Sequence, residues 1–279
     1  MRRTFSALLI FAMLLSFAAC GSKNKEGTVE PVIPTASPVA TPEATPTPEP
    51  EDTPKPAPAI AITIETESGT RDVGGFDVAT FSYDYPVIEI SEDAEGDFTE
   101  ILDWAESVKN ESQQIVQDLC AEAEDAYTHA AHWFTNAYFY TNTLELMSVS
   151  DSIAVLKSDN NTYMGSNHPL HGLYAWVIDT KNGTVLELND FGDSELLINA
   201  LASHIIGQIE ADEMESYLFP DYEDCVLAGI YDGFWYPTAE GIVVMYPEYA
   251  IAPYSEGCFE FTVAYELLGE LIDTTLIEE

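Results

Sequence analysis

The sequence predicts an α+β fold of antiparallel sheets, with one long helix and one or two shorter helices packed on one face. Three observations support this class. Segments that alternate like strands are clustered between helices and do not alternate regularly with them. Residues 98–123 carry apolar side chains at helical spacing throughout. Residues 173–188 have the pattern of a β-hairpin.

The hairpin consists of Leu173–Asp179 and Thr184–Leu188, joined by the loop Lys181–Gly183. A three-residue loop with glycine in third place suits a type I turn whose glycine is left-handed. The predicted register pairs apolar residues on one face, which must then be covered. These pairs are Ile178 with Leu186 and Trp176 with Leu188.

In the segment before the hairpin, the sequence predicts strands that precede the long helix and strands that follow it. Ala61–Thr66 and Thr80–Ile90 alternate like strands. Asp97 and Glu100 then form a capping box at the start of the helix. Further strands are expected at Trp133–Val149 and Ser152–Lys157, and a turn at Asp159–Asn161.

The segment after the hairpin begins with a helix capped by Asp193 or Ser194. Leu197, Leu201 and Ile205 lie on one face of this helix. An acidic, irregular stretch follows, and then three strands and a short helix. Their predicted bounds are Glu210–Asp224 for the irregular stretch, Gly229–Tyr236, Ile242–Tyr246 and Cys258–Tyr265 for the strands, and Glu266–Ile272 for the helix.

The first sixty residues predict export and attachment to a bacterial cell membrane, on its extracytoplasmic face. Residues 1–19 combine two arginines with a short apolar run, which is typical of a signal peptide. Phe17–Cys20 resembles a lipobox, so we expect Cys20 to be lipidated. Residues 20–59 are rich in Pro, Thr and Glu and read as an unfolded spacer. Residues 60–160 and 161–279 are then the N-terminal and C-terminal parts of the exported region.

The charge balance limits the partners of the chain. Forty-nine acidic residues stand against nine basic ones, which gives a net charge of −40. Such a surface repels nucleic acid, and it attracts cations and basic proteins. The alternative is that the negative charge only keeps an exported protein soluble.

Motifs for common chemistries are absent from the sequence, including nucleophile elbows, phosphate loops and dinucleotide fingerprints. We therefore predict no catalytic residue, no cofactor and no metal. Two H-x-x-H pairs, His129/His132 and His168/His171, are too short to indicate zinc without a third ligand. Of the remaining cysteines, Cys120 is expected in the core, and Cys225 and Cys258 either form a disulfide or stay free.

Two loops are the candidate ligand-binding site, and we expect them at the same end of one sheet. The first is the aromatic, proline-rich segment Tyr246–Gly257, and the second is the turn at Asn167-His168-Pro169. Tyrosines on a rigid loop give contact area at low entropic cost. The alternative is that these rings support the sheet from beneath the loop. The candidate residues are Asn167, His168, Tyr249, Pro253, Tyr254 and Glu256.

The order of several short motifs carries a resemblance to a known family. The order is Tyr163, Gly165, His168-Pro169, a hairpin with an Asn-Gly turn, Asp190-Phe191, Gly241–Val244, Tyr249, Ala252-Pro253-Tyr254 and Gly257. It resembles the extracytoplasmic domain of RsiV-type anti-sigma factors, which also occurs beside peptidoglycan deacetylase domains. The resemblance covers roughly residues 60–272 and is best in 162–258.

The resemblance implies binding of a basic, lysozyme-type wall hydrolase, or a position near peptidoglycan. Signalling and deacetylation do not carry over, because no sigma-binding segment, transmembrane helix or deacetylase domain is recognised. We therefore expect a surface-anchored lipoprotein that binds an extracellular ligand. The alternatives are an enzyme acting on cell-wall glycan and a passive structural or adhesive lipoprotein.

Overall fold

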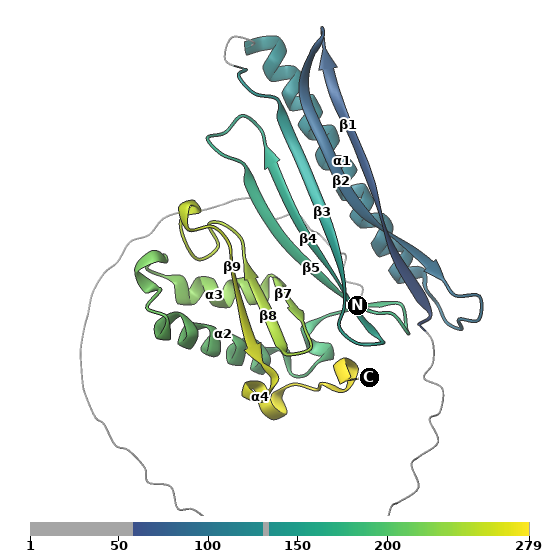
Figure 1. The fold of residues 1–279 in the computed structure, drawn as a ribbon, viewed down its shortest axis with the longest axis vertical. Helices are drawn as coiled ribbons and strands as arrows, with labels where there is room; N and C mark the ends of the chain where they lie inside the picture. The colour runs from purple at the N-terminus through teal and green to yellow at the C-terminus, as the bar shows by residue number, and fades with distance from the viewer. Residues whose placement is uncertain (1–57, 131–133, 279) are drawn as a thin grey trace, which may run out of the picture. The chain divides into compact units, whose positions relative to one another are not determined.

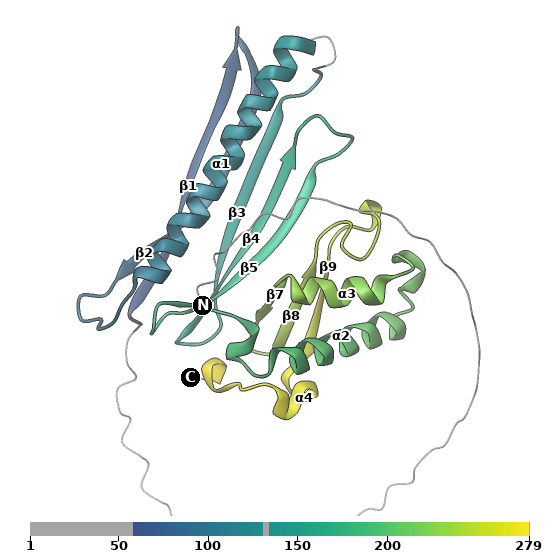
Figure 2. The same cartoon turned by 180° about the vertical axis from the view of Figure 1, so that it is seen from behind.

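A computed structural model of the chain describes residues 58–130 and 134–278. The predicted signal peptide, Cys20, most of the spacer and His132 lie outside these residues. Residues 53–279 form one compact unit, and it has the α+β class that the sequence predicted: antiparallel sheets, one long helix and shorter helices (Figures 1 and 2). Among the described residues, no helix is both long enough and apolar enough to cross a membrane.

The larger sheet has six strands whose order in space equals their order in the chain. All neighbours are antiparallel except β2 and β3, which are parallel. A parallel pair needs a long crossover, and the helix α1 (Thr99–Ala130) supplies it. The six strands are β1 (Ile60–Val73), β2 (Phe76–Ile90), β3 (Tyr138–Ser148), β4 (Ile153–Tyr163), β5 (Leu170–Asp179) and β6 (Thr184–Leu186).

The helix α1 buries one stripe of small and branched residues against β2 and β3. The predicted apolar periodicity is therefore confirmed. The carboxylate of Asp97 accepts a hydrogen bond from the backbone N–H of Thr99 at 3.0 Å, just before the first turn. The buried stripe contains Ile101, Ala105, Val108, Val116, Leu119 and Ala123.

β4 runs further than the sequence predicted. The turn expected at Asp159–Asn161 is wrong, because these residues continue β4 and pair with β3 on one side and β5 on the other. Two sets of ladder hydrogen bonds here outweigh the turn preference of Asp and Asn. The chain turns only after Tyr163, and the boundary drawn between residues 160 and 161 lies inside this strand.

The register of the hairpin differs by one residue from the prediction. Ile178 pairs with Val185, not with Leu186, because the loop has four residues, Thr180–Gly183. The carboxylate of Asp179 accepts hydrogen bonds from the backbone N–H groups of residues 181 and 182 and so closes this longer loop. Gly183 has φ +65°, the left-handed conformation that the sequence predicted.

The C-terminal part of β5 is covered on both faces, whereas the sequence predicted one apolar face. Ile178 is fully buried and packs in the cluster under α1, together with Ile101. Its neighbour Val177 is 2% exposed and packs in the other cluster, on the opposite face of the strand. β5 is therefore a central strand between two layers, as strands that are apolar on both sides usually are.

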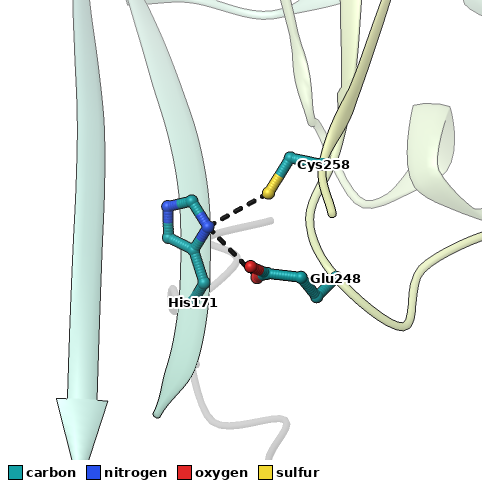
Figure 3. Close-up of side chains that lie close together, drawn as sticks. All are labelled: His171, Glu248 and Cys258. Atoms are coloured by element: carbon teal, nitrogen blue, oxygen red, sulfur yellow. Dashed lines mark hydrogen bonds and ion pairs between the residues drawn. The ribbon is translucent and has the colours of Figure 1, made fainter. Parts of the chain in front are cut away.

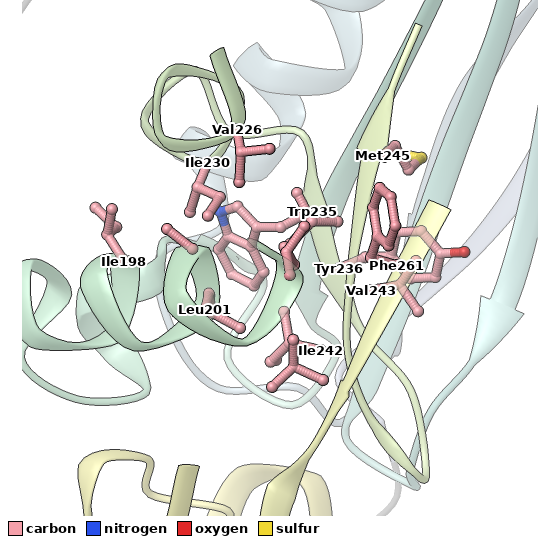
Figure 4. Close-up of a cluster of buried hydrophobic side chains, with 14 of the residues drawn as sticks. Ile198, Leu201, Val226, Ile230, Trp235, Tyr236, Ile242, Val243, Met245 and Phe261 are labelled. Atoms are coloured by element: carbon pink, nitrogen blue, oxygen red, sulfur yellow. The ribbon is translucent and has the colours of Figure 1, made fainter. Parts of the chain in front are cut away.

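The second layer contains a three-stranded antiparallel sheet and two helices. β8 is buried along its whole length, between the larger sheet and the helices. Side chains of α2 and α3 meet those of the small sheet around Trp235 (Figure 4). Asp193 caps α2, as predicted, by accepting from the N–H of Leu196 at 3.1 Å. The elements are β7 (Trp235–Pro237), β8 (Gly241–Tyr246), β9 (Phe259–Ala264), α2 (Ser194–Ala211) and α3 (Tyr222–Tyr231).

Two predicted elements of this layer are wrong in type or extent. Residues 229–231 end α3 and do not begin a strand, and residues 222–224 belong to α3, not to an irregular stretch. The ring of Tyr246 lies across α3: its hydroxyl donates to the carbonyl of Val226 at 2.9 Å, and a Cβ at Gly229 would lie 2.6 Å from the ring. Gly229 thus permits close helix–strand contact. The predicted final helix is the short α4 (Tyr265–Leu268), and a 3₁₀ turn and α5 (Thr275–Glu278) follow.

The three cysteines of the described residues, Cys120, Cys225 and Cys258, are all free. The disulfide that the sequence left open between Cys225 and Cys258 is therefore not formed. Cys225 lies on α3, whereas Cys258 directly precedes β9. Cys120 lies on α1 and packs against the core cluster that contains Val116, Leu119 and Tyr140, as predicted.

Candidate functional site

The two loops chosen from the sequence lie side by side, although they belong to two different sheets. The β4–β5 connection (164–169) contains Asn167 and His168, and the β8–β9 connection (247–258) contains Tyr249 and Tyr254. The hydroxyl of Tyr249 lies 2.9 Å from Nε2 of His168. The expectation of one shared sheet end is therefore wrong, but the proximity that it implied is present.

His168, Tyr249 and Tyr254 form what we call the aromatic cluster. The rings of His168 and Tyr254 are stacked, with centroids 3.8 Å apart, and Tyr249 lies 5.9 Å from Tyr254. Nδ1 of His168 is 2.9 Å from the carbonyl of Pro169, so we assign the proton to Nδ1. Nε2 then accepts from the Tyr249 hydroxyl. His168 thus ties its own turn to the neighbouring loop.

The backbone of the β8–β9 connection holds Tyr249 in a costly conformation. Its φ is +68°, which is rare for a residue with a side chain and costs on the order of 1–3 kcal/mol. The hydrogen bond to His168 and the contact with Tyr254 offset part of this cost. Tyr249 is 40% exposed, so its side chain is accessible to solvent in this conformation.

The other predicted residues surround this cluster without joining it. Pro253 and Glu256 are exposed on the β8–β9 connection, and Asn167 is exposed in the β4–β5 connection. Tyr254 is half-buried, because one of its faces is stacked on His168. The rings therefore support the loop and are also partly exposed to solvent, and ligand binding by this loop stays a prediction.

Beside the aromatic cluster lies a polar cluster of His171, Glu248 and Cys258, which we call the His171 cluster. The three side chains point toward one another from β5 and from the two ends of the β8–β9 connection (Figure 3). Nδ1 of His171 is 3.0 Å from Sγ of Cys258 and 3.1 Å from Oε2 of Glu248. Its Nε2 is 2.8 Å from a carboxylate oxygen of Asp159 on β4.

The protons of this cluster follow from its partners. Asp159 can only accept, so Nε2 of a neutral His171 carries the proton and Nδ1 accepts from the Cys258 thiol. Burial and the nearby Glu248 carboxylate raise the pKa of Cys258 to about 11, which keeps the thiol protonated at neutral pH. With this neutral imidazole, the buried Oε2 of Glu248 accepts no proton from His171 and faces the lone pair of Nδ1 at 3.1 Å.

This arrangement suits two kinds of chemistry. Thiol, imidazole and carboxylate in sequence are the groups of a nucleophilic cysteine. However, a reactive cysteine needs a lowered pKa, and that of Cys258 is raised. The same sulfur, nitrogen and carboxylate oxygen are also ligands that zinc prefers. The raised pKa argues against a nucleophilic cysteine, whereas the set of ligand atoms fits a cation.

Sequence reasoning found the aromatic cluster but missed the His171 cluster. In the sequence, Glu248 is only one acidic residue of the segment Tyr246–Gly257, and Cys258 is either half of a disulfide or a free thiol. The H-x-x-H spacing was misleading, because His168 and His171 contact different partners. His129 ends α1 near Asp125, and His132 lies outside the described residues. No sequence spacing could reveal that His171 on β5 meets Glu248 and Cys258 of the distant β8–β9 connection.

Comparison with known proteins identifies a family of unknown function, DUF3298, which matches residues 197–266. These residues include α2, α3, the small sheet and the loop that carries Tyr249 and Tyr254. No curated protein matches the chain.

Two solved structures of DUF3298 proteins are similar to the chain. A member from Bacteroides fragilis NCTC 9343 is 17% identical, with a TM-score of 0.58, over 80% of this chain and 98% of that protein. A family protein from Pseudomonas aeruginosa PAO1 is 13% identical, with a TM-score of 0.47, over 78% of this chain and 96% of its own. The chain therefore carries a region similar to DUF3298 and has the fold of the Bacteroides fragilis member.

Proposed function

We propose that this protein is a lipid-anchored, extracytoplasmic binding protein whose folded part binds a basic, lysozyme-type wall hydrolase. The binding surface that we infer is the aromatic cluster with Pro253, Glu256 and Asn167 around it. The resemblance to the extracytoplasmic domain of RsiV-type anti-sigma factors supports this ligand class. The DUF3298 match is compatible with that resemblance and names no ligand.

The observation that carries the proposal is that Tyr249 and Tyr254, two of the three rings of the aromatic cluster, lie in a segment without lysine or arginine. No lysine or arginine follows Lys181 in the chain. The other basic side chains of the described residues are engaged elsewhere. Arg71 pairs with Glu124 and Lys157 with Glu260, while the ammonium group of Lys109 lies over the ring of Tyr85.

A negative surface around exposed rings favours a basic protein partner. Opposite charges on two surfaces speed their encounter and reject partners of the same sign. Tyrosine rings at the centre of a contact supply most of its binding energy. The hydrogen bond from Tyr249 to His168 holds the ring in place and so limits the entropy that is lost on binding. The acidic surface then guides the partner, and the rings hold it.

Calorimetric titration of the full chain in detergent with a basic lysozyme tests the proposal. We expect a one-to-one complex at low ionic strength. The matched control is the same lysozyme with its lysines succinylated, which reverses their charge and should abolish binding. Equal binding of native and succinylated lysozyme, or no complex with any basic muramidase, would contradict the proposal. Binding to purified peptidoglycan alone would assign the surface to the wall instead.

A further inference from the structure

We propose that His171, Glu248 and Cys258 bind a divalent cation of the zinc class. The ligand atoms are Nδ1 of His171, Oε2 of Glu248 and Sγ of Cys258. This inference concerns the His171 cluster alone and does not depend on the proposed protein ligand. It rests on the geometry of the three atoms, on an unpartnered buried oxygen and on the orientation of the imidazole.

The three ligand atoms are already placed around one point. They all lie within 4.8 Å of one another, and the side chains converge from different elements (Figure 3). Tetrahedral zinc, with bonds of about 2.0–2.3 Å, holds such atoms about 3.3–3.6 Å apart. The nitrogen–sulfur and nitrogen–oxygen distances are 3.0 and 3.1 Å. The two atoms nearest Nδ1 would therefore move apart from it by about half an ångström to admit the ion.

The hydrogen bonds of the cluster leave one group unsatisfied. With a neutral His171, the single proton of the Cys258 thiol can go either to Nδ1 of His171 or to Glu248, so one of these two acceptors is left without a donor. Such an unpartnered buried acceptor is costly. A cation between the three side chains would accept lone pairs from Nδ1 of His171, Oε2 of Glu248 and Sγ of Cys258 together.

Charge is balanced when the cation binds. The thiol loses its proton to solvent, and a sulfur–metal bond takes the place of the sulfur–hydrogen bond. One thiolate and one carboxylate then neutralise the two positive charges of the ion, while the imidazole stays neutral. No oxidant or reductant is involved. Water fills the fourth position of a tetrahedral ion with three protein ligands.

Asp159 is a positioning residue for this site. Its carboxylate holds the Nε2 proton of His171, which leaves the Nδ1 lone pair facing Glu248 and Cys258. Carboxylates behind ligating histidines are common in metal sites, and they fix the tautomer and the orientation of the ring. The sulfur and imidazole ligands favour zinc over magnesium and calcium, which require oxygen.

The ion would also stabilise the β8–β9 connection, which carries Tyr249 and Tyr254. Glu248 immediately precedes Tyr249, and Cys258 ends the same β8–β9 connection. His171 lies near the start of β5, three residues after His168. Coordination would therefore link both ends of this connection to the larger sheet. Metal binding is expected to raise the melting temperature of the protein by several degrees.

Equilibrium dialysis of the full chain in detergent against zinc, followed by elemental analysis, tests the site. We expect one zinc ion per chain. Cys258→Ser should lower the zinc affinity at least tenfold, whereas Cys225→Ser, which alters the half-buried thiol on α3, should leave it unchanged. Asp159→Asn, which keeps all three ligands, should weaken binding about 10–100-fold.

Cobalt(II) in place of zinc gives an independent readout. A thiolate ligand produces a sulfur-to-cobalt charge-transfer band in the near ultraviolet, which should vanish in Cys258→Ser and persist in Asp159→Asn at saturating cobalt. This second variant keeps the test valid if Cys258→Ser fails to fold. Unchanged zinc content in Cys258→Ser, or no such band in the wild-type protein, overturns the proposal. So does alkylation of Cys258 at the same fast rate with and without zinc, which would assign a nucleophilic thiol.

Discussion

Replacing Tyr254 by alanine separates the part that this ring plays in binding from its part in folding. The change removes a ring that is stacked on His168 with centroids 3.8 Å apart. The lost aromatic pair should cost about 1 kcal/mol of folding stability. As a central binding anchor, the ring should contribute about 2 kcal/mol or more to the complex with a basic lysozyme, which corresponds to about thirtyfold in affinity.

His168→Ala should lower folding stability more than it lowers affinity for the lysozyme. It removes hydrogen bonds to Tyr249 and Pro169 together with the stack on Tyr254, so the loss of stability should be about 2–3 kcal/mol. The assay pairs the dissociation constant with the melting temperature of each variant. Tyr231→Ala, which alters a tyrosine that is 59% exposed at the end of α3, is the matched control and should change neither. If Tyr254→Ala loses stability but keeps its affinity, the ring is only a support and the binding surface lies elsewhere.

Three further changes test separate parts of the account. Cys20→Ala should move the protein from the detergent phase to the aqueous phase in phase partitioning, and a variant that stays in the detergent phase would contradict lipidation. Gly183→Ala should destabilise the protein by about 2 kcal/mol or more in urea unfolding, because φ is +65° and a Cβ would lie 2.5 Å from the ring of Phe98; an unchanged urea midpoint would refute this. The pKa of Cys258 is raised from 9.0 to about 11 in the folded state, so its protonated thiol stabilises the fold below pH 9, and this contribution is lost as the pH rises through about 11. With a chelator present, the wild-type protein should therefore lose more stability than Cys258→Ser between pH 8 and about 11, and parallel losses in the two proteins would count against this.

The sequence correctly predicted the features that depend only on residues close together in the chain. The apolar stripe of α1 and the Asp193 cap of α2 are present as expected, since both depend on residues three or four positions apart. The left-handed Gly183 followed from the turn chemistry alone. These features need no knowledge of distant parts of the chain.

The errors arose where tertiary contacts outweigh local preference. Asp159–Asn161 has the composition of a turn, yet pairing on both sides keeps it in β4. The hairpin register shifted by one residue because the Asp179 side chain closes a four-residue loop. Gly229 was assigned to a strand, but its missing side chain permits Tyr246 to pack against α3. None of these contacts has a signature within a short window of sequence.

The candidate site divides in the same way. Aromatic and proline-rich composition marked the loop of Tyr249 and Tyr254, and a short motif marked His168. His171, Glu248 and Cys258 meet only through the packing of β5 against the β8–β9 connection. Three residues of different type, without regular spacing, give no pattern that sequence reasoning can detect.

The salt dependence of the association rate tests whether the acidic surface guides a basic lysozyme to the aromatic cluster. Stopped-flow mixing of the full chain with a basic lysozyme, between about 0.01 and 1 M salt, shortens the screening length from about 30 Å to 3 Å. We predict that the association rate constant falls at least tenfold over this range, because the acidic surface guides the encounter. The dissociation rate constant should change little, because the rings hold the complex. An association rate that does not depend on salt, or no complex at the lowest salt concentration, would contradict it.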